Sequence, residues 1–485
     1  MPLSAPLILD LDGTLLLGDM LLESLALVVR RNPLSVILCI WWLVSGGRPL
    51  LKAKLADIAY PDIAFVPVNA AVASLAEREH AAGRPVVLAT AANELIARRF
   101  AQRFPFISRV FASDATRNLK GGRKRDVLME SFPGGFIYAG DSTADLPVWK
   151  RSAAAVTVGA PASLVAAVTR AGVPVHQLAG PQHGWKTFAR AVRLQQAVKN
   201  VLIFAPLLLA GRYGDAGAWY LAFFAFLGFS LVAAGTYLVN DILDLAHDRR
   251  HRTKSLRPLA SGTLPLRTAF LAIPVLSFIG GMAAFEAGGA VLALVALYAA
   301  ATLAYSFWLK RIPILDTLII AGLFSLRLLT GVVAIGAVLS PWLFVFSTAL
   351  FLSIALAKRH TEVVKLKGSG ERALLGRGYG AVDEPLVLGL GTGAALASIT
   401  FLSLYLMSDM AHASLYASPA FLWIAPVAVF LWLGRVWLLS QRGQLNDDPV
   451  AFAVRDRPSL ALGGTVAAAF ILASTVSLPL QWSVT

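Results

Sequence analysis

The sequence predicts two parts of different fold class: an α/β domain with a Rossmann-like parallel sheet over residues 1–185, and an all-α membrane bundle of nine transmembrane helices over residues 186–485. Three observations predict this division. Of the 485 residues, 57% are hydrophobic and only 15% are charged, which is too apolar for an ordinary soluble enzyme. Short β-branched runs alternate with charged helical stretches in the N-terminal part, whereas apolar stretches long enough to cross a bilayer fill the rest.

Four short apolar runs in the first part predict buried parallel strands, at 7–9, 85–90, 136–140 and 155–158. The N-terminus has no basic region and no long apolar core, so we expect no signal peptide and a cytoplasmic first domain. A single cysteine, Cys39, excludes an intrachain disulfide and a Cys-x-x-Cys metal or redox site.

The apolar segment 33–45, which contains Trp41 and Trp42, is too short to span a bilayer and lies inside the predicted soluble domain. We expect it to form a buried helix of a cap subdomain. The alternative is an interfacial helix with its tryptophans at the level of the lipid head groups.

Nine apolar stretches of the second part approach the roughly 20 residues that a membrane span needs. They lie at 199–212, 217–240, 266–285, 288–308, 313–336, 340–357, 386–407, 418–440 and 460–482. Lysine and arginine gather after the second, fourth, sixth and eighth spans, which places those loops on the cytoplasmic side of a bacterial inner membrane. The net charge of +15 favours anionic lipids and phosphorylated substrates over nucleic acid, because no basic tract is interleaved with aromatic residues.

The first strand ends in Asp10-Leu-Asp12-Gly-Thr, and carboxylates two residues apart on an extended chain point toward one site. One carboxylate can attack phosphorus while the other handles the proton of the leaving group. Later segments add a hydroxyl for a phosphate oxygen, a lysine to neutralise its charge, and two carboxylates for Mg²⁺. These residues are Thr90, Lys120 or Lys124, Asp141 and Asp145.

In this order the motifs resemble the haloacid dehalogenase superfamily of phosphatases over about residues 5–175. The resemblance implies that Asp10 is the nucleophile, that Asp12 is the general acid and base, and that residues 15–80 form a helical cap. It also implies phosphate ligands at Thr90 and a lysine, of which we prefer Lys120 to Lys124, and a Mg²⁺ site formed by Asp10, Asp12, Asp141 and Asp145. The alternative is an inactive scaffold that keeps the pocket.

The second predicted span runs into Asn240-Asp241-Ile-Leu-Asp244-Leu-Ala-His-Asp248. This spacing places three carboxylates on one face of a helix. Such a group is costly near a membrane unless a cation neutralises it, and Mg²⁺ prefers oxygen ligands and bridges carboxylates to phosphates. The alternative is a solvated helix end. A basic run that contains Arg257 follows directly.

Together these residues resemble the UbiA-type polyprenyl transferase superfamily over about residues 190–482. Aromatic prenyltransferases of this superfamily carry a second acidic motif after the sixth span, whereas this chain has the basic loop Lys358-Arg-His-Thr-Glu-Val-Val-Lys365 there. One acidic and one basic face suit two phosphorylated substrates. The pattern resembles the decaprenyl-phosphate phosphoribosyltransferase branch.

That resemblance implies transfer of 5-phosphoribose from phosphoribosyl pyrophosphate to a polyprenyl phosphate, with Mg²⁺ and the pyrophosphate held by Asp241, Asp244 and Asp248. Expected ligands of substrate phosphates are Lys199, Asn200, Lys254, Arg257, Lys310, Lys358 and Arg359. Expected orienting groups are Tyr237, Asn240 and Glu362. Arg327, inside the fifth span, is expected to line the site, the alternative being a structural partner between helices.

The transfer product keeps a phosphate on its ribose, so we expect the first domain to remove it and give polyprenylphosphoryl ribose. Two alternatives remain open. The bundle transfers a prenyl group to an aromatic or other small acceptor beside an independent phosphatase, or it is a transporter or lipid-binding module. Mg²⁺ is expected in both domains; the expected partners are the two substrates and the bilayer, with a homo-oligomer left open.

Overall fold

The structure is a computed structural model that describes residues 5–114, 117–180, 184–369, 374, 377–410, 415–445, 452–453 and 456–477. The chain forms two compact units. The first unit comprises Met1–Leu194 and Tyr237–Val275, and the second comprises Gln195–Thr236 and Leu276–Thr485. The acidic helix end and the basic run after it therefore belong to the first unit, together with the N-terminal sheet. Each unit is described by itself.

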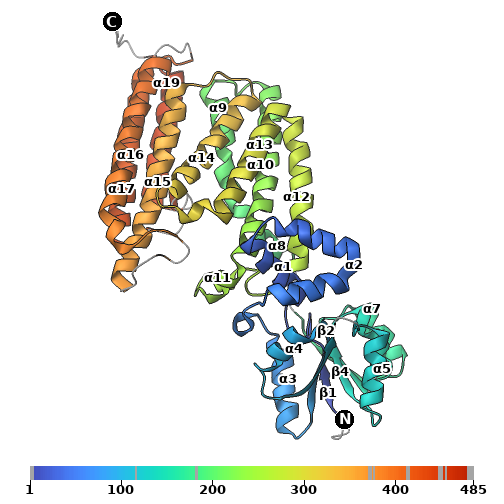
Figure 1. Ribbon diagram of the computed structural model, residues 1–485. Helices are drawn as coiled ribbons and strands as arrows, with labels where there is room; N and C mark the ends of the chain where they lie inside the picture. Colours follow the sequence, from blue (N-terminus) through green and yellow to red (C-terminus); the bar gives the residue numbers. More distant parts are fainter. Residues whose placement is uncertain are drawn as a thin grey trace. The chain divides into compact units, whose positions relative to one another are not determined.

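A six-stranded parallel sheet in the order β3-β2-β1-β4-β5-β6 forms the centre of the first unit, which confirms the predicted parallel α/β architecture (Figure 1). The strands are β1 (Leu7–Leu9), β2 (Val86–Asn93), β3 (Ile107–Ser113), β4 (Ile137–Gly140), β5 (Ala154–Val158) and β6 (Val175–Leu178). Helices α3 (Ala70–Ala81) and α4 (Glu94–Ala101) cover one face, and α5 (Gly122–Ser131) and α7 (Ala162–Arg170) cover the other; α6 (Leu146–Trp149) packs beside them.

The four predicted strands are the central ones, which are buried on both faces. In β1, Leu7 and Leu9 enter one core and Ile8 enters the other, as side chains of successive strand residues must. The edge strands β3 and β6 were not predicted. They are only partly buried and carry polar residues such as Arg109 and His176, so they lack the continuous apolar run that marks a buried strand.

Helices fill the chain between β1 and β2, where the sequence predicts a cap. They are α1 (Met20–Arg31), α2 (Ser35–Ile58), a 3-10 turn (Ile63–Phe65) and α3. The carboxylate of Asp19 starts α1 by accepting the backbone N–H groups of Leu21 and Leu22. Gly47 adopts a φ of 65° inside α2, and Figure 1 shows α2 as two helical stretches joined by a sharp bend.

The expectation that residues 33–45 form a buried helix is wrong. Ile37, Trp41 and Val44 are 66%, 65% and 78% exposed, respectively. Among the apolar residues of this stretch, only Cys39 and, in part, Trp42 pack against the rest of the cap. This stretch is apolar around its whole circumference, so contact with one neighbouring helix leaves the other sides uncovered.

Eight single helices match the second to ninth predicted spans: α10 (Ala216–Leu243), α12 (Leu266–Glu286), α13 (Gly289–Phe307), α14 (Leu315–Ala334), α15 (Pro341–Ser369), α16 (Glu384–Tyr405), α17 (Ile424–Gln441) and α19 (Arg457–Thr475). Each is long and apolar enough to cross a membrane. Within the second unit α10 and α12 approach closely at two glycines, since a Cβ on Gly228 would lie 2.8 Å from the carbonyl oxygen of Gly280.

The first predicted span, 199–212, is not one regular helix. A 3-10 helix over Leu194–Phe204 leads into the short α9 (Ala205–Leu209), and the separate helix α8 (Trp185–Ala191) precedes them in the chain. Pro206 lies in the first turn of α9, where its missing N–H costs nothing. Among the described residues α2 is a further helix of sufficient length and apolar character to cross a membrane.

Candidate functional site

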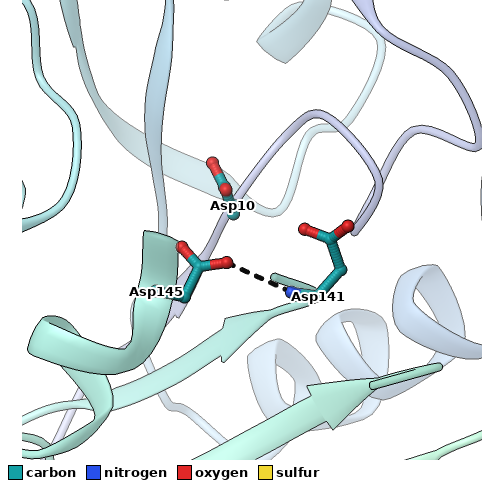
Figure 2. Close-up of side chains that lie close together, drawn as sticks. All are labelled: Asp10, Asp141 and Asp145. Carbon is teal, nitrogen blue, oxygen red and sulfur yellow. Dashed lines mark hydrogen bonds between the residues drawn. The ribbon is translucent and has the colours of Figure 1, made fainter. Parts of the chain in front are cut away.

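The first site lies at the carboxyl edge of the sheet, where Asp10 follows β1 and Asp141 follows the neighbouring strand β4. The Asp10 backbone N–H donates to the Ala139 carbonyl, at 2.9 Å, which fixes the two strand ends together. One carboxylate oxygen from each of Asp10, Asp141 and Asp145 lies within 4.8 Å of the others (Figure 2). The parallel sheet thus brings together three carboxylates that are far apart in sequence.

Two local features hold these carboxylates in place. Asp145 accepts the backbone N–H groups of Asp141 and Ser142, at 3.2 and 3.1 Å, and the first of these bonds is drawn in Figure 2. Gly13 has a φ of 76°, and a Cβ at this position would lie 2.3 Å from Oδ2 of Asp141. The turn after β1 therefore needs glycine both for its backbone conformation and for the space that Asp141 occupies.

Lys124, and not the preferred Lys120, is the lysine of this site. Its Nζ lies 2.9 Å from Oδ1 of Asp10 and donates to the Tyr138 hydroxyl at 2.8 Å, and that hydroxyl donates to Asp145 at 2.8 Å. Lys120 is exposed, because it precedes α5, whereas Lys124 lies on the buried side of that helix. The preference for Lys120 is corrected accordingly.

Asp12 does not share the three-carboxylate cluster. Its carboxylate accepts the backbone N–H of Met20 at 2.9 Å, at the start of the cap. The extended-chain argument fails here because β1 ends at Leu9 and Asp12 lies in the turn beyond it. Thr90 is fully buried in β2, and its hydroxyl oxygen accepts the N–H of Ala92 at 3.0 Å.

Burial perturbs the acids of this site. Desolvation raises the pKa of Asp10 to about 6, against the opposing charge of Lys124, and it raises the pKa of Asp141 to about 7 with help from the neighbouring Asp145. The pKa of Asp12 is raised well above its ordinary value by burial and by the charge of Asp19. A carboxyl that keeps its proton near neutral pH suits an acid that must give a proton to a leaving group.

The three-carboxylate cluster fits a Mg²⁺ ion. Carboxylates are the hard oxygen ligands that Mg²⁺ prefers, and two ligands on opposite sides of the ion are about 4.2 Å apart. The 4.8 Å spread of the three oxygens needs only a small contraction to reach that geometry. Asp10, Asp141 and Asp145 would hold the ion, and the Asp12 side chain would not.

The second group of acids lies at the end of α10, also in the first unit. Arg257 connects two of them, since its Nη1 lies 3.2 Å from Oδ1 of Asp241 and 2.6 Å from Oδ2 of Asp248. Arg193 also pairs with Asp241 and stacks over the Tyr237 ring. Both carboxylates are almost fully buried, so the paired arginines offset a large desolvation cost.

Asp244 interrupts the predicted single helical face. It lies between the end of α10 and the start of α11 (Leu245–Arg250), with a non-helical φ/ψ pair. Asp241 and Asp248 both contact the guanidinium of Arg257, so their carboxylates are placed to share one positive charge. Asp244 is half-buried, and within the described part of the chain only Asp10, Asp141 and Asp145 bring three carboxylate oxygens within 4.8 Å of one another.

The remaining expected residues of the first unit lie near this helix end. Asn240 is half-buried in the last turns of α10, and Lys254 is half-buried at the start of a 3-10 turn (Lys254–Leu256). Arg257 was expected to hold a substrate phosphate. In this arrangement its guanidinium binds the carboxylates of Asp241 and Asp248 instead.

In the second unit, Arg359 is not a free phosphate ligand. It is almost fully buried, and it donates to Asp316 at 2.6 Å and to Glu362 at 2.5 Å. Asp316 also accepts the hydroxyl of Tyr379 at 2.6 Å. The expectation for Arg359 is corrected: two carboxylates neutralise its charge, and Glu362 orients it.

Asn200 and Arg327 form a structural pair between helices, which corrects the expectation that each would serve the substrate. The Asn200 side chain accepts from Nε of Arg327 at 2.7 Å and donates to Ser230 at 2.9 Å. The guanidinium of Arg327 lies over the rings of Phe229 and Tyr298. Both polar ends of Asn200 are therefore used inside the bundle.

The other expected basic residues of the second unit are each half-buried: Lys199, Lys310 and Lys358. Lys199 lies 5.8 Å from the centre of the Phe324 ring, and Lys310 lies in a 3-10 turn (Leu309–Arg311) after α13. Lys358 directly precedes Arg359 on α15. The role of these three lysines as phosphate ligands stays a prediction.

Two further buried acids, Asp316 and Glu23, are not among the residues expected from the sequence. Asp316 lies at the start of the fifth predicted span, where an acid in an apolar stretch is itself a signal of function or pairing. Glu23 lies in the first turn of α1 and makes two bonds with Arg249, at 2.6 and 2.9 Å. Nothing in the local sequence around Glu23 points to a partner more than two hundred residues away.

Comparison with known proteins gives relatives for most of the chain. An uncharacterized protein, y4nM, from Sinorhizobium fredii is 40% identical and covers 96% of this chain and 91% of its own length. A decaprenyl-phosphate phosphoribosyltransferase from Corynebacterium glutamicum is 34% identical over 38% of this chain and 56% of its own length. A solved UbiA homolog from Archaeoglobus fulgidus, bound to DMAPP and Mg²⁺, is 15% identical over 60% of this chain and all of its own, with a TM-score of 0.46.

The family model of the UbiA prenyltransferase family matches residues 201–457. This match covers α10 with Asp241, the acids and arginines that follow it, and the buried Arg359–Asp316 pair. The apolar helices found here agree with a multi-pass membrane transferase of that kind. The chain therefore belongs to the UbiA prenyltransferase family.

Proposed function

We propose that the chain makes a polyprenylphosphoryl ribose in two steps. The membrane part transfers 5-phosphoribose from phosphoribosyl pyrophosphate to a polyprenyl phosphate, and the N-terminal part removes the 5-phosphate. The observation that carries the proposal is the presence, in one chain, of an acidic helix end of the UbiA family and a separate three-carboxylate cluster with a buried lysine. The partial similarity to decaprenyl-phosphate phosphoribosyltransferases supports the choice of substrates.

In the transfer step an oxygen of the lipid phosphate attacks the anomeric carbon of the donor ribose, and the bond to pyrophosphate breaks. Asp241 and Asp248 are proposed to hold the Mg²⁺ that would neutralise this leaving group. Arg257 contacts the same two carboxylates, and its guanidinium is proposed to hold the pyrophosphate beside them. Lys358 is proposed to hold the phosphate of the second substrate.

In the hydrolytic step Asp10 attacks the phosphorus of the ribose 5-phosphate and displaces the sugar oxygen, which takes a proton from Asp12. Water then attacks the phosphoaspartyl group, and Asp12 accepts the proton as inorganic phosphate leaves. Lys124 neutralises the charge that develops on the phosphate oxygens. The Mg²⁺ bound by Asp10, Asp141 and Asp145 would supply further positive charge.

The proposed location is a bacterial inner membrane, with both sites on the cytoplasmic side. The basic loops after alternate predicted spans support this orientation, because lysine and arginine gather on the cytoplasmic side. Both soluble substrates, phosphoribosyl pyrophosphate and water, are then available to the same face.

The transfer is tested with purified protein, decaprenyl phosphate, Mg²⁺ and phosphoribosyl pyrophosphate labelled in its ribose. Wild type and the control Asp126→Asn, an exposed aspartate on α5, should move the label into lipid, and Asp241→Asn should not. Absence of labelled lipid with wild type, together with transfer of a labelled prenyl diphosphate to an aromatic acceptor, would replace the proposal by the prenyltransferase alternative.

A further inference from the structure

The N-terminal half of α2 presents an apolar surface that no described part of the chain covers. Leu34, Ile37, Leu38, Trp41 and Val44 are all exposed, and their spacing places them on one face of the helix. Val36, Ile40 and Leu43, also exposed, widen that face. We call the residues from Leu34 to Val44 the apolar cap segment. Single exposed apolar side chains are common on protein surfaces, whereas a contiguous apolar surface such as this one marks an interaction site.

The apolar cap segment does not cross a bilayer, although α2 is long enough to do so. Gly47 breaks the helix, so the first stretch, Ser35 to Gly46, is only about 18 Å long, against about 30 Å of hydrocarbon. The guanidinium of Arg31 donates to the carbonyl of Ile58 at 2.8 Å, which joins the end of α1 to the end of α2. The chain therefore enters and leaves α2 on the same side of the bilayer.

The cap lies beside the end of the candidate span α10, which indicates that a membrane surface covers the apolar cap segment. Ala26 and Leu27 of α1 line one small cavity together with Ile242 and Leu243, the last residues of the candidate span α10. The buried Glu23–Arg249 pair fastens α1 to the residues that follow the span. Since a span leaves the hydrocarbon near its last residues, the cap lies at the level of a membrane surface.

The composition of the segment fits that surface. No charged residue occurs between Asn32 and Arg48, and the two serines in this stretch satisfy their hydroxyls on backbone carbonyls, those of Val28 and Trp41. The exposed Arg31, Arg48 and Lys54 flank the segment. Apolar and tryptophan side chains bordered by basic residues are the pattern of a helix that lies in the interface of an anionic bilayer.

We propose that the apolar cap segment inserts into one leaflet of the bilayer and anchors the cap there. A second anchor beside the spans keeps the N-terminal site close to the lipid head groups. Together with the proposed phosphatase function, on which this last step rests, the anchor favours a lipid-linked phosphate monoester over a soluble one as the substrate of this site.

Insertion is tested with the full chain in vesicles of phosphatidylethanolamine and phosphatidylglycerol. In a Cys39→Ala background, an environment-sensitive fluorophore is attached to Ile37→Cys, to Val44→Cys, or to the control Leu95→Cys, an exposed leucine on α4. The first two probes should show blue-shifted emission and quenching by lipids spin-labelled near the head group. The Leu95 probe should be quenched by aqueous iodide instead.

Two results would overturn the proposal. Quenching of the Ile37 and Val44 probes by iodide, as at Leu95, would show that water covers the segment. Protection from both iodide and labelled lipid would show that protein, such as a second copy of the chain, covers it.

The substrate class has a separate readout. The Ile37→Glu/Val44→Glu variant should lose hydrolysis of a lipid-linked phosphate monoester and keep hydrolysis of soluble p-nitrophenyl phosphate. A variant that hydrolyses each of the two substrates as fast as wild type does would contradict the lipid-linked substrate class. Wild type that hydrolyses neither substrate would refute the phosphatase function, while the quenching result would still decide insertion.

Discussion

At the scale of single residues, the N-terminal site depends on one buried cation among several buried acids. Lys124 contacts Asp10 directly and reaches Asp145 through the Tyr138 hydroxyl. A buried carboxylate without a cation is costly, so the lysine stabilises the ionised form of Asp10, the proposed nucleophile, and is placed to bind the phosphate of the proposed substrate. The site is thus defined by contacts that sequence spacing alone does not give.

Replacing Lys124 tests this assignment. Lys124→Met should reduce p-nitrophenyl phosphate hydrolysis by about 100-fold or more, because the charge that balances the transferring phosphoryl group is lost. The matched change Lys120→Met, at an exposed position, should leave the rate nearly unchanged. A larger loss from Lys120→Met than from Lys124→Met would reverse the assignment.

The raised pKa values of Asp10 and Asp141 predict a pH dependence of metal binding. Protons compete with Mg²⁺ for these carboxylates, so the apparent affinity should fall as the pH drops through about 7 and then about 6. In metal-free protein the raised pKa values stabilise the fold fully below the ordinary value of 3.8, and this contribution is lost as the pH rises through about 6 and 7.

Isothermal titration of Mg²⁺ into wild type and Asp141→Asn at several pH values measures the effect. The variant should bind Mg²⁺ weakly at every pH. An affinity for wild type that stays constant across pH 5 to 8 would contradict the pH dependence.

At the scale of elements, buried ion pairs connect helices that are distant in sequence. Arg359 on α15 pairs with Asp316 on α14 inside the second unit, and Arg249 after α10 pairs with Glu23 on α1 inside the first. Removing one partner of such a pair leaves an uncompensated buried charge. These pairs should therefore matter more to stability and geometry than surface ion pairs do.

Two adjacent residues on α15 have different predicted roles: Arg359 stabilises the fold, and Lys358 is proposed to bind a substrate phosphate. Arg359→Gln should destabilise the protein by about 3 kcal/mol and lower its thermal unfolding temperature in detergent, since Asp316 loses its main partner. Lys358→Gln should raise the KM for one phosphorylated substrate. An unfolding temperature of Arg359→Gln equal to that of wild type would contradict the structural role of Arg359.

The Glu23–Arg249 pair should couple the cap to the acidic helix end. Glu23→Gln and Arg249→Met should each cost about 3 kcal/mol, and the double variant should cost less than their sum, because no buried charge remains. Thermal unfolding of the four proteins gives the coupling energy. Strict additivity would show that the pair contributes no specific interaction.

The sequence predicts an element when its residues form a long or continuous apolar run, and it fails when polar residues or a bend interrupt that run. Uniform apolar runs predict central strands such as β1 and later spans such as α14. Edge strands with polar residues, and the bent start of the bundle around Pro206, do not. The choice between Lys120 and Lys124, and the partners of Arg257 and Arg359, depend on contacts between distant segments, which local spacing does not encode.

At the scale of the whole molecule, the chain combines a UbiA-family membrane transferase with a parallel α/β sheet that carries its own carboxylate cluster. The residues after α10 belong to the same compact unit as the N-terminal sheet and contact the cap, where Arg249 pairs with Glu23, so the two sets of acids belong to one compact body. This arrangement is what a chain would need to transfer a phosphorylated sugar to lipid and then remove its phosphate.

The most direct test is the mass spectrum of the lipid product formed from decaprenyl phosphate and phosphoribosyl pyrophosphate. Wild type should give decaprenylphosphoryl ribose, and Asp10→Asn should give a product heavier by one phosphate group, because transfer continues while hydrolysis stops. The same product mass from wild type and Asp10→Asn would contradict the coupling of the two steps.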